Sequence, residues 1–512
     1  MMGRLANDQD KFFYDFHLED HVPSDHLLRR IDAVLDLSWL RAELSPFYSL
    51  IGRPSVDPEL MIRMLLIGYC FGLRSERRLC DEVHLNLAYR WFCRLGLEDR
   101  VPDHSTFSLN RHGRFREARV LRSVFEDVVR HCMGAGLVGG EGFAIDASVM
   151  EADASRYHGL PGTDEIDWTD PRFDTRAARE YLDALDPEPN PARKTPKVIS
   201  ISDPCSAWTA KANKRVQFGY GLNYLIDNKH AVIVDAEATP ARTYDEVAAT
   251  RTMIERTEAR FGLKPRRLAA DTAYGTGKNL AWLMERGIEP HIPVWDRSTR
   301  KDGTFSRADF SYDGERDVYT CPRGKALKSS GKVHSDNTLR YLASTYDCGP
   351  CPLKARCCPN TPQRKIPRDI NEHARDYARS LAGTEPFEQS RRERKKVEML
   401  FAHLKRHMGF ERLRLRGFSG ANDEFLLAAT VQNLRRLAKL AAIPTAPDPE
   451  NSVIAMPERQ KHRPKGQKPP RDQPPAEAKS PLLGKVAIEH RLRPTLSTVS
   501  AIGERRMNST IF

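Results

Sequence analysis

The sequence predicts an α/β protein in which a mixed β-sheet is flanked by helices and preceded by an all-helical region. Three observations support this prediction. Apolar residues recur at helical spacing as far as about residue 135. Short apolar runs typical of buried strands begin at about residue 139. Three such runs follow one another before the order becomes helix, strand, helix and strand, which favours one mixed sheet covered by helices.

The helical region is predicted to span residues 1–135. Asp57 followed by Pro58 is typical of a helix N-cap with proline at the first helical position. Gly72 and Ser75 separate this helix from the next one. Three cations cluster at the start of that next helix: Arg74, Arg77 and Arg78. Both a helix-turn-helix-like DNA-binding unit and an ordinary small helical bundle fit this pattern.

The sheet is predicted to lie in residues 136–296. Five segments are expected to form its strands: 139–149, 216–227, 230–240, 265–275 and 289–295. Amphipathic helices are expected over 245–262 and 279–287. The first apolar run ends at Asp146 and the fourth ends at Asp271. Each of these carboxylates is therefore expected at the end of a strand, where side chains of neighbouring strands can share a crevice.

Three further segments complete the predicted organisation. Residues 297–375 are polar, carry five of the ten cysteines and interrupt the alternation of strands and helices. Residues 376–443 return to helical spacing and are assigned to the same core. Residues 444–512 are rich in Pro, Lys, Arg, Gln and Glu, a composition that predicts a basic disordered tail.

Composition limits the class of protein. Hydrophobic residues make up 40% and charged residues 29%, which is typical of a soluble globular chain. No apolar run approaches the roughly 20 residues that span a bilayer, and the charged N-terminus does not resemble a signal peptide. We therefore expect a cytoplasmic protein with no membrane partner, whose cysteines are thiols or metal ligands. The net charge of +12 and the pI near 9.2 favour a nucleic acid as partner.

One helix carries an acid beside its apolar side. In the stretch RRERKKVEMLFAHLKRHMG, an apolar stripe is formed by Val397, Leu400, Phe401, Leu404 and Met408. Arg394, Glu398 and Lys405 fall in a second row at the edge of that stripe, because each residue turns the helix by about 100°. An i,i+4 ion pair on a solvated helix would explain Arg394 and Glu398 equally well.

Glu398, Asp146 and Asp271 together suggest a different role. A lone Asp at a strand end is usually a turn or cap residue. Three acids on two strands and one helix of one basic domain are the hard oxygen ligands that Mg²⁺ or Mn²⁺ prefers. Two such ions can activate the attacking oxygen and stabilise the leaving oxygen at a phosphodiester, in hydrolysis and in strand transfer alike. Lys405 and Arg394 could then contact a phosphate.

These residues resemble a known signature. The R-x3-E-x6-K spacing of Arg394, Glu398 and Lys405 resembles the third-acid motif of bacterial insertion-sequence transposases with a DDE, ribonuclease H-like catalytic domain. FAIDAS resembles the family's first-Asp strand, and LAADTAYGTGKN resembles its second-Asp motif. The stretches SDPCSAW, FGYGLNYLID, AEATPARTYD, VPDHSTFS and GRPSVDPELMIRMLLIGYCFGLRSERRL also fit, so that the resemblance covers roughly residues 10 to 440.

The resemblance implies a metal-dependent transposase with an α/β, ribonuclease H-like fold. Such an enzyme binds double-stranded DNA at its element's terminal inverted repeats, hydrolyses at the ends and joins the 3′-hydroxyls to target DNA. It would act in the bacterial nucleoid as a homo-oligomer on DNA. Asp146, Asp271 and Glu398 would take the metal-binding positions, and Lys405 and Arg394 the accompanying basic ones. The family usually has Tyr three residues before its Arg, where this chain has Arg391.

The cysteines of residues 297–375 form a candidate zinc site. Cys348 and Cys351 have the C-x2-C spacing of a zinc knuckle, and Cys321 and Cys357 could complete a tetrahedral structural Zn²⁺ site. Cys358 lies next to Cys357. Similar cysteine clusters occur in a branch of the transposases that this chain resembles. The alternative is a reduced thiol cluster without metal.

Two other functions compete with transposition. A ribonuclease H-like DNA nuclease would cut without joining, and the carboxylates serve water and a 3′-hydroxyl alike. A catalytically inactive DNA-binding derivative is the second competitor, and intact acids at all three positions count against it. A strand-transfer assay separates the first competitor from a transposase.

Overall fold

A computed structural model of the protein describes residues 16–49, 51, 55–185, 195–210, 215–294 and 302–440. These residues belong to one compact unit that extends to Pro444. The predicted tail, residues 444–512, lies outside the described residues. None of the described helices is long and apolar enough to cross a bilayer.

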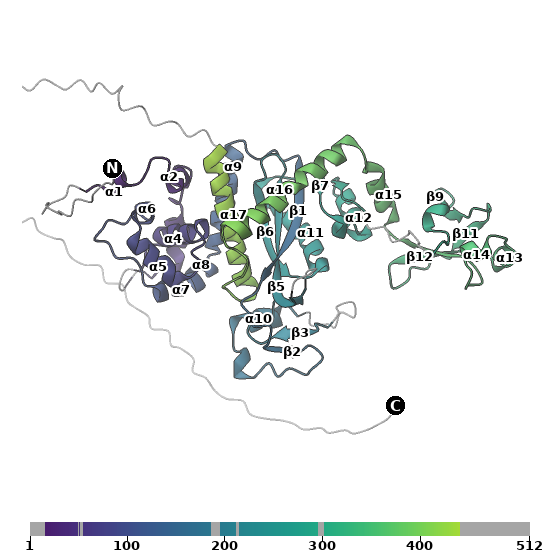
Figure 1. Ribbon diagram of the computed structural model, residues 1–512, viewed down its shortest axis with the longest axis horizontal. Coiled ribbons are helices and arrows are strands. Elements are labelled where there is room, and N and C mark those ends of the chain that lie inside the picture. The colour runs from purple at the N-terminus through teal and green to yellow at the C-terminus, as the bar shows by residue number, and fades with distance from the viewer. Residues whose placement is uncertain are drawn as a thin grey trace, which may run out of the picture. The chain divides into compact units, whose positions relative to one another are not determined.

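The N-terminal part of the described chain is helical, as predicted (Figure 1). Its helices are α1 (Leu18–His21), α2 (Leu27–Asp32), α3 (Leu40–Leu44), η1 (Ser45–Phe47), α4 (Pro58–Cys70), α5 (Glu76–Leu85), α6 (Leu87–Phe92), α7 (His104–His112), α8 (Arg114–Glu117) and α9 (Val120–Gly134). The predicted cap of α4 is confirmed, because the Asp57 carboxylate accepts a hydrogen bond from the Glu59 N–H at 2.8 Å. Ser75 caps α5 in the same way through the N–H of Arg78.

The central sheet contains the five predicted strands and one short strand. Its strands are β1 (Gly142–Glu151), β4 (Ala207–Thr209), β5 (Gln217–Asp227), β6 (Ile233–Pro240), β7 (Arg267–Ala269) and β8 (Glu289–His291). The order β5-β1-β7-β8 continues from β5 to both β4 and β6. β1, β5 and β6 pair antiparallel, whereas β7 and β8 run parallel to β1. The predicted mixed sheet is therefore confirmed.

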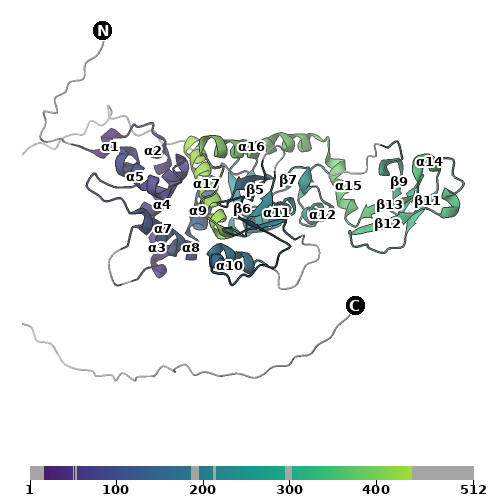
Figure 2. The ribbon, with the colours of Figure 1, turned by 60° about the horizontal axis from the view of Figure 1, so that its bottom comes forward.

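Helices cover both faces of this sheet (Figure 2). They are α11 (Thr243–Phe261), α12 (Gly277–Glu285), α15 (Glu372–Leu381), α16 (Glu385–His407) and α17 (Gly417–Leu440). Apolar residues of α16, α17 and α9 form one large core with one face of the strands, while those of α11, α12 and α15 form a second core with the other face. Because side chains alternate along a strand, each residue of β1 belongs to one of these two faces.

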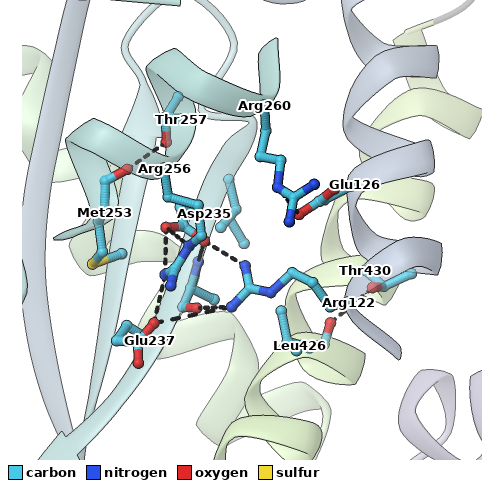
Figure 3. Close-up of polar contacts among 12 residues, drawn as sticks. Arg122, Glu126, Asp235, Glu237, Met253, Arg256, Thr257, Arg260, Leu426 and Thr430 are labelled. Carbon is cyan, nitrogen blue, oxygen red and sulfur yellow. Dashed lines mark hydrogen bonds and ion pairs between the residues drawn. The ribbon is translucent and has the colours of Figure 1, made fainter. Parts of the chain in front are cut away.

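An ionic cluster fastens α9 to the sheet (Figure 3). Asp235 on β6 is 3% exposed and accepts hydrogen bonds from Arg122 of α9 at 2.6 Å and from Arg256 of α11 at 2.6 Å. Arg256 also pairs with Glu237, two residues further along β6. Buried charges as well as apolar packing therefore join α9, the last helix of the N-terminal region, to β6.

The segment before α15 forms its own small sheet, which the sequence did not predict. β9 (Ser311–Asp313), β10 (Val318–Thr320), β11 (Ala326–Ser329), β12 (Thr338–Leu342) and β13 (Lys365–Asp369) pair antiparallel in the order β13-β12-β11-β10-β9. Two short helices follow β12: α13 (Thr345–Cys348) and α14 (Lys354–Cys357). The strands have only three to five residues and bury few apolar side chains, so their alternation is too weak to detect.

Four short elements lie between β1 and β4 in the described part of the chain. They are β2 (Gly159–Pro161), η2 (Pro171–Phe173), α10 (Arg176–Asp183) and β3 (Val198–Ser200). β2 and β3 pair with each other as a separate two-stranded sheet. One further turn of 3-10 helix, η3 (Thr272–Tyr274), follows β7, and another, η4 (Arg307–Asp309), precedes β9.

Candidate active site

Strand β1 places Asp146 on the face of the sheet that α16 covers. Ala144 and Met150 point into the core shared with α16, while Phe143 and Ile145 point to the opposite core. Alternation therefore puts Asp146 on the α16 face. The prediction that the strand ends at this residue was wrong. β1 continues to Glu151, because it remains paired with β5 beyond the apolar run.

Asp271 follows the neighbouring strand directly. β7 pairs parallel with the first half of β1 and ends at Ala269, two residues before Asp271. The Asp271 carboxylate accepts a hydrogen bond from the Ala273 N–H at 2.9 Å and so caps η3. Its predicted position at the end of a strand is confirmed. Ala269 points into the same core as Ala144, so Asp271 emerges on the side of the sheet that carries Asp146.

Helix α16 brings the third acid. It begins after Thr384 with proline in its first turn, and all five residues of the predicted stripe are buried against the sheet: Val397, Leu400, Phe401, Leu404 and Met408. Phe401 stacks on Tyr224 with ring centroids 5.1 Å apart, and Tyr224 is the strand partner of Asp146 on β5. Glu398 stands at the rim of this stripe with 52% of its side chain exposed.

Arg394 joins two of the three acids. Its Nη1 lies 3.3 Å from Oδ2 of Asp146, and its Nη2 lies 2.9 Å from Oε1 of Glu398. The i,i+4 ion pair of the simple interpretation therefore exists. The same guanidinium also holds an acid of the sheet, which an ion pair on a solvated helix does not require.

The site is electrostatically acidic despite this cation. The pKa of Asp146 is raised to about 6, mainly by burial. The hydrogen bond from the Ala147 N–H and the charge of Arg394 lower this pKa, whereas the charges of Asp271 and Glu398 contribute to its rise. The phenol of Tyr274 is buried beside the same acids, and burial raises its pKa well above the usual value. Its hydroxyl has no hydrogen-bond partner within the described part of the chain. Arg394 thus contacts two carboxylates, and Asp271 and the Tyr274 ring lie close enough to Asp146 to interact with it electrostatically.

Lys405 lies further along the same strand. Its Nζ donates to Oγ of Ser148 at 2.8 Å and to the carbonyl of Val149 at 3.2 Å. Ser148 is two residues beyond Asp146 on the same face of β1. The structure therefore brings together Asp146, Arg394 and Glu398 by direct contact, with Asp271 close enough to act on Asp146. Lys405 contacts β1 at Ser148, two residues beyond Asp146.

The carboxylates are not arranged as a closed ligand set. Across the described residues, no three Asp, Glu, His or Cys side chains are placed to hold one metal ion jointly. The Glu398 carboxylate is turned toward Arg394, whose guanidinium lies between it and Asp146. The positive charge of Arg394 therefore already lies between the carboxylates of Asp146 and Glu398.

The five cysteines of the small sheet converge on one cavity of about 190 Å³. Cys348 and Cys357 both contact the thiol of Cys358, and Cys351 acts electrostatically on Cys348. Burial raises the pKa of Cys357 to about 11. All five thiols are free of disulfides. The four predicted ligands are thus neighbours, and Cys358, which the prediction left out, is the thiol that contacts two others.

Two residues of the site were missed in the sequence. Tyr274 was not singled out, although it follows Asp271 by one turn of η3 in the second-Asp motif. Cys358 was noted only as adjacent to Cys357. The C-x2-C spacing identified Cys348 and Cys351, whereas a pair of consecutive cysteines carries no comparable spacing signal.

Two regions of the chain match families of known proteins. Residues 16–113 match the transposase domain family DUF772, and residues 320–438 match the transposase DDE domain family. Both matches are to transposase families, and together they support the predicted insertion-sequence DDE transposase. The predicted family, the α/β fold class and the link to DNA transposition and recombination are confirmed.

The second match includes both α16 and the cysteine cluster of this transposase. Glu398, Arg394 and Lys405 therefore lie within the DDE domain region. Asp146 and Asp271 lie outside both matched regions, and their relation to Glu398 comes from the geometry alone. Within the small sheet before α15, the matched region includes β11, β12 and β13, whereas β9 and most of β10 precede it.

Proposed function

We propose that this transposase binds the terminal inverted repeats of its element and catalyses metal-dependent hydrolysis at the ends, followed by transfer of the 3′-hydroxyls to target DNA. The observation that supports this proposal is the cluster of Asp146, Asp271 and Glu398 around Arg394 on one face of the sheet. A structural ion pair would need one acid for one arginine. Here Arg394 contacts two acids and a third, Asp271, acts electrostatically on one of them, which leaves an excess of negative charge for a divalent ion to neutralise.

The chemistry of the donor set fits Mg²⁺ or Mn²⁺. All three groups offer carboxylate oxygens, which are the ligands that these hard cations prefer. Arg394 is a stand-in cation between Asp146 and Glu398. Asp146, Asp271 and Glu398 would hold the ions, which when bound supply an activated attacking oxygen and stabilise the leaving oxygen.

The chain's own basic groups have separate roles in this proposal. Arg394 orients Asp146 and Glu398 toward each other through its two nitrogens. Hydrogen bonds to Ser148 and Val149 hold the ammonium group of Lys405 beside β1. A fixed cation there can hold a phosphate of the DNA strand in register with the acids. The buried ring of Tyr274 excludes water from the inner side of the site.

In the same proposal, thiols of the cysteine cluster would hold a structural Zn²⁺ once their side chains turn toward one ion. Five thiols around one small cavity are a donor set that suits zinc, which binds thiolates in fours. The small sheet buries few large apolar side chains, so a metal would supply stability that its core lacks. The ion would have no part in the reaction.

The decisive experiment measures end cleavage and joining on DNA that carries the sequences flanking the gene. Wild type and Glu398→Gln are compared with Mg²⁺ and with EDTA. Glu388→Gln is the matched control, because Glu388 lies on the same helix and pairs only with Arg391 at 2.6 Å. Joined product from wild type and the control, lost in Glu398→Gln and in EDTA, supports the proposal. Cleavage without joining would identify a nuclease, and unchanged activity of Glu398→Gln would contradict the site.

A further inference from the structure

A basic cavity of about 670 Å³ lies next to the candidate active site. Five cationic side chains and two acidic ones line it, and the cations come from two separate parts of the chain. Arg74 and Arg78 belong to the end of the α4–α5 connection and the start of α5, whereas Lys405, Arg412 and Arg414 belong to the end of α16 and the segment that follows it. The cavity is therefore composite.

A close approach of two backbones forms this cavity. Gly72, at φ +71°, turns the chain between α4 and α5, and a Cβ at this position would meet the carbonyl oxygen of Met408 at 3.3 Å. The turn therefore lies directly against the end of α16. Only a residue without a side chain permits both the left-handed conformation and this contact at no cost.

The inner wall of the cavity is built from buried charges. Arg74 is 7% exposed, forms an ion pair with the buried Glu424 of α17 and donates to the carbonyl of Arg412. Its ring contact with Phe410 places the guanidinium 4.1 Å from the ring centroid. Glu424 also accepts hydrogen bonds from the backbone N–H groups of Arg414 and Leu415. These contacts hold the segment after α16 in one conformation.

This wall has unused hydrogen-bonding capacity. The Nε of Arg74 is buried and has no hydrogen-bond partner among the residues the structure describes. Leaving such a donor unpaired costs about 1–3 kcal/mol, and more for a charged group. A buried arginine with a spare donor on the wall of a polar cavity is the arrangement that an anionic ligand completes.

The outer wall carries exposed cations. Arg78 is 68% exposed, and its guanidinium contacts Glu82 at 3.4 Å. Arg414 is exposed, and its guanidinium forms no ion pair within the described ranges. Arg412 shares its charge with Asp153 at 3.3 Å, which offsets part of the positive potential. Arg78 and Arg414 thus remain available to a ligand with several negative charges.

Lys405 connects the cavity with the acids. It lines the cavity and contacts β1 two residues beyond Asp146. It also follows Glu398 by seven residues on α16, which is about 10 Å along the helix axis. Each strand of B-DNA carries one phosphate per 3.4 Å of its axis, so this separation corresponds to about three base pairs. A strand whose reacting phosphate lies at the acids would bring neighbouring phosphates to the cavity.

We propose that this cavity is a phosphodiester-binding subsite for the DNA strand that enters the active site, formed jointly by the α4–α5 turn and the end of α16. The inference rests on the proposed function for the identity of the strand. It adds that the N-terminal helices take part in positioning the reacting end, because Arg74 and Arg78 are two of the five cations that line the cavity.

The test compares two double variants that remove the same charge. Arg78→Gln with Arg414→Gln removes the two available cations of the outer wall. The control, Arg179→Gln with Arg316→Gln, removes two exposed cations elsewhere, which are 65% and 82% exposed. All four side chains are at the surface, so neither variant should unfold, and thermal melting checks this. Binding to a duplex from the flanking sequence and to a random-sequence duplex is measured in EDTA as a function of salt.

The cavity variant should lose two phosphate contacts. The slope of log affinity against log salt should become shallower by about 2 relative to wild type, and affinity at low salt should fall about tenfold or more on both duplexes. The control double variant should keep the wild-type slope. Equal losses in both double variants would show a general charge effect and overturn the proposal, as would an unchanged slope in the cavity variant.

A second measurement locates the contact. Single phosphates of the duplex are replaced in turn by neutral methylphosphonates. Wild type should lose affinity at one or two adjacent positions near the cleaved end, and the cavity variant should be insensitive at those positions. An identical profile for both proteins would refute the subsite. Because cleavage is not measured, failure of the catalytic proposal and failure of this one give different results.

Discussion

The guanidinium of Arg394 lies 3.3 Å from the carboxylate of Asp146 and, through its other nitrogen, 2.9 Å from that of Glu398. A side chain of the helix thereby holds an acid of the sheet and an acid of its own helix. The same two acids are the ones we propose as ligands of a divalent ion. Arg394 and that ion then compete for the same negative charge, and this competition can be measured.

Arg394→Gln should bind Mn²⁺ more tightly than wild type while cleaving less DNA. Removing a positive charge beside two carboxylates raises the affinity for another cation, by about tenfold after allowance for solvent screening. Isothermal titration with Mn²⁺ measures this change. Arg392→Gln is the control, since Arg392 is exposed and lies about 200° around the helix from Arg394. Weaker Mn²⁺ binding in Arg394→Gln would contradict this prediction and would mean that the orienting role of Arg394 outweighs its competition with the ion.

Asp271→Asn should abolish cleavage and leave DNA binding within about twofold of wild type. Asn can accept the hydrogen bond from Ala273 that caps η3, so the local fold should persist while a charged ligand is lost. Gel-shift binding and end cleavage are measured in parallel. Asp167→Asn is the matched control, because the carboxylate of Asp167 accepts a similar bond from the N–H of Thr169 at an exposed position. Loss of binding together with cleavage would argue against the assignment of Asp271.

Asp235→Asn should destabilise the fold by about 3 kcal/mol. Two arginines converge on this buried carboxylate, and its neutralisation leaves both of them with less compensation in a desolvated position. Glu237→Gln should cost less than about 1 kcal/mol, because Glu237 is 26% exposed and water can take its place. Urea unfolding of both variants gives the comparison. Equal losses would indicate that burial does not decide the strength of this network.

Asp203 should make stability depend on pH. Burial raises its pKa to about 7, although Tyr220 donates to its Oδ1 at 2.6 Å. The folded state therefore binds the proton more tightly than the unfolded state. This contribution is complete below about pH 4 and is lost as the pH rises through about 7. Relative to Asp203→Asn, wild type should lose up to about 3 kcal/mol between pH 4 and 8, measured by unfolding at each pH. A constant difference would contradict the shift.

Cys351→Ser should lower both the bound zinc and the melting temperature. Loss of one thiolate weakens a tetrahedral site and the small sheet that depends on it. Elemental analysis and thermal melting are the measurements, and Cys80→Ser is the control because Cys80 is half-buried and distant in the chain from the cluster. Wild type without zinc, melting at the same temperature as Cys351→Ser, would leave a reduced thiol cluster.

Long periodic elements could be predicted from the sequence, and short ones could not. The apolar stripe of α16 and the runs of β5 and β6 each extend over eight or more residues, so their spacing is unambiguous. β9 to β13 are too short for such a signal. The end of β1 was placed too early because its second half is polar on the face that meets α16, where Asp146 and Ser148 take the place of apolar side chains.

The residues of the candidate site could be predicted from the sequence, but the contacts between them could not. Helical geometry puts Arg394 and Glu398 one turn apart, which is a local relation. The contact of Arg394 with Asp146 joins residues that are 248 positions apart, and no local pattern encodes it. The cavity beside Lys405 could not be predicted from the sequence either. Arg74 and Arg414 become neighbours only in the folded chain, where Glu424 of α17 contacts both of them.

The place of α17 in the core has a consequence for how the chain matures. Leu426, Val431 and Leu434 of this helix lie in the same core as Leu28 of α2 and Ile62 of α4. Yet α17 leaves the ribosome about 350 residues after α4 does. Part of the apolar surface of the N-terminal helices therefore stays uncovered during synthesis until residue 440 has left the ribosome. The same helix thus completes the core of the central sheet and that of the N-terminal helices, so that a nascent chain cut short before α17 lacks part of both.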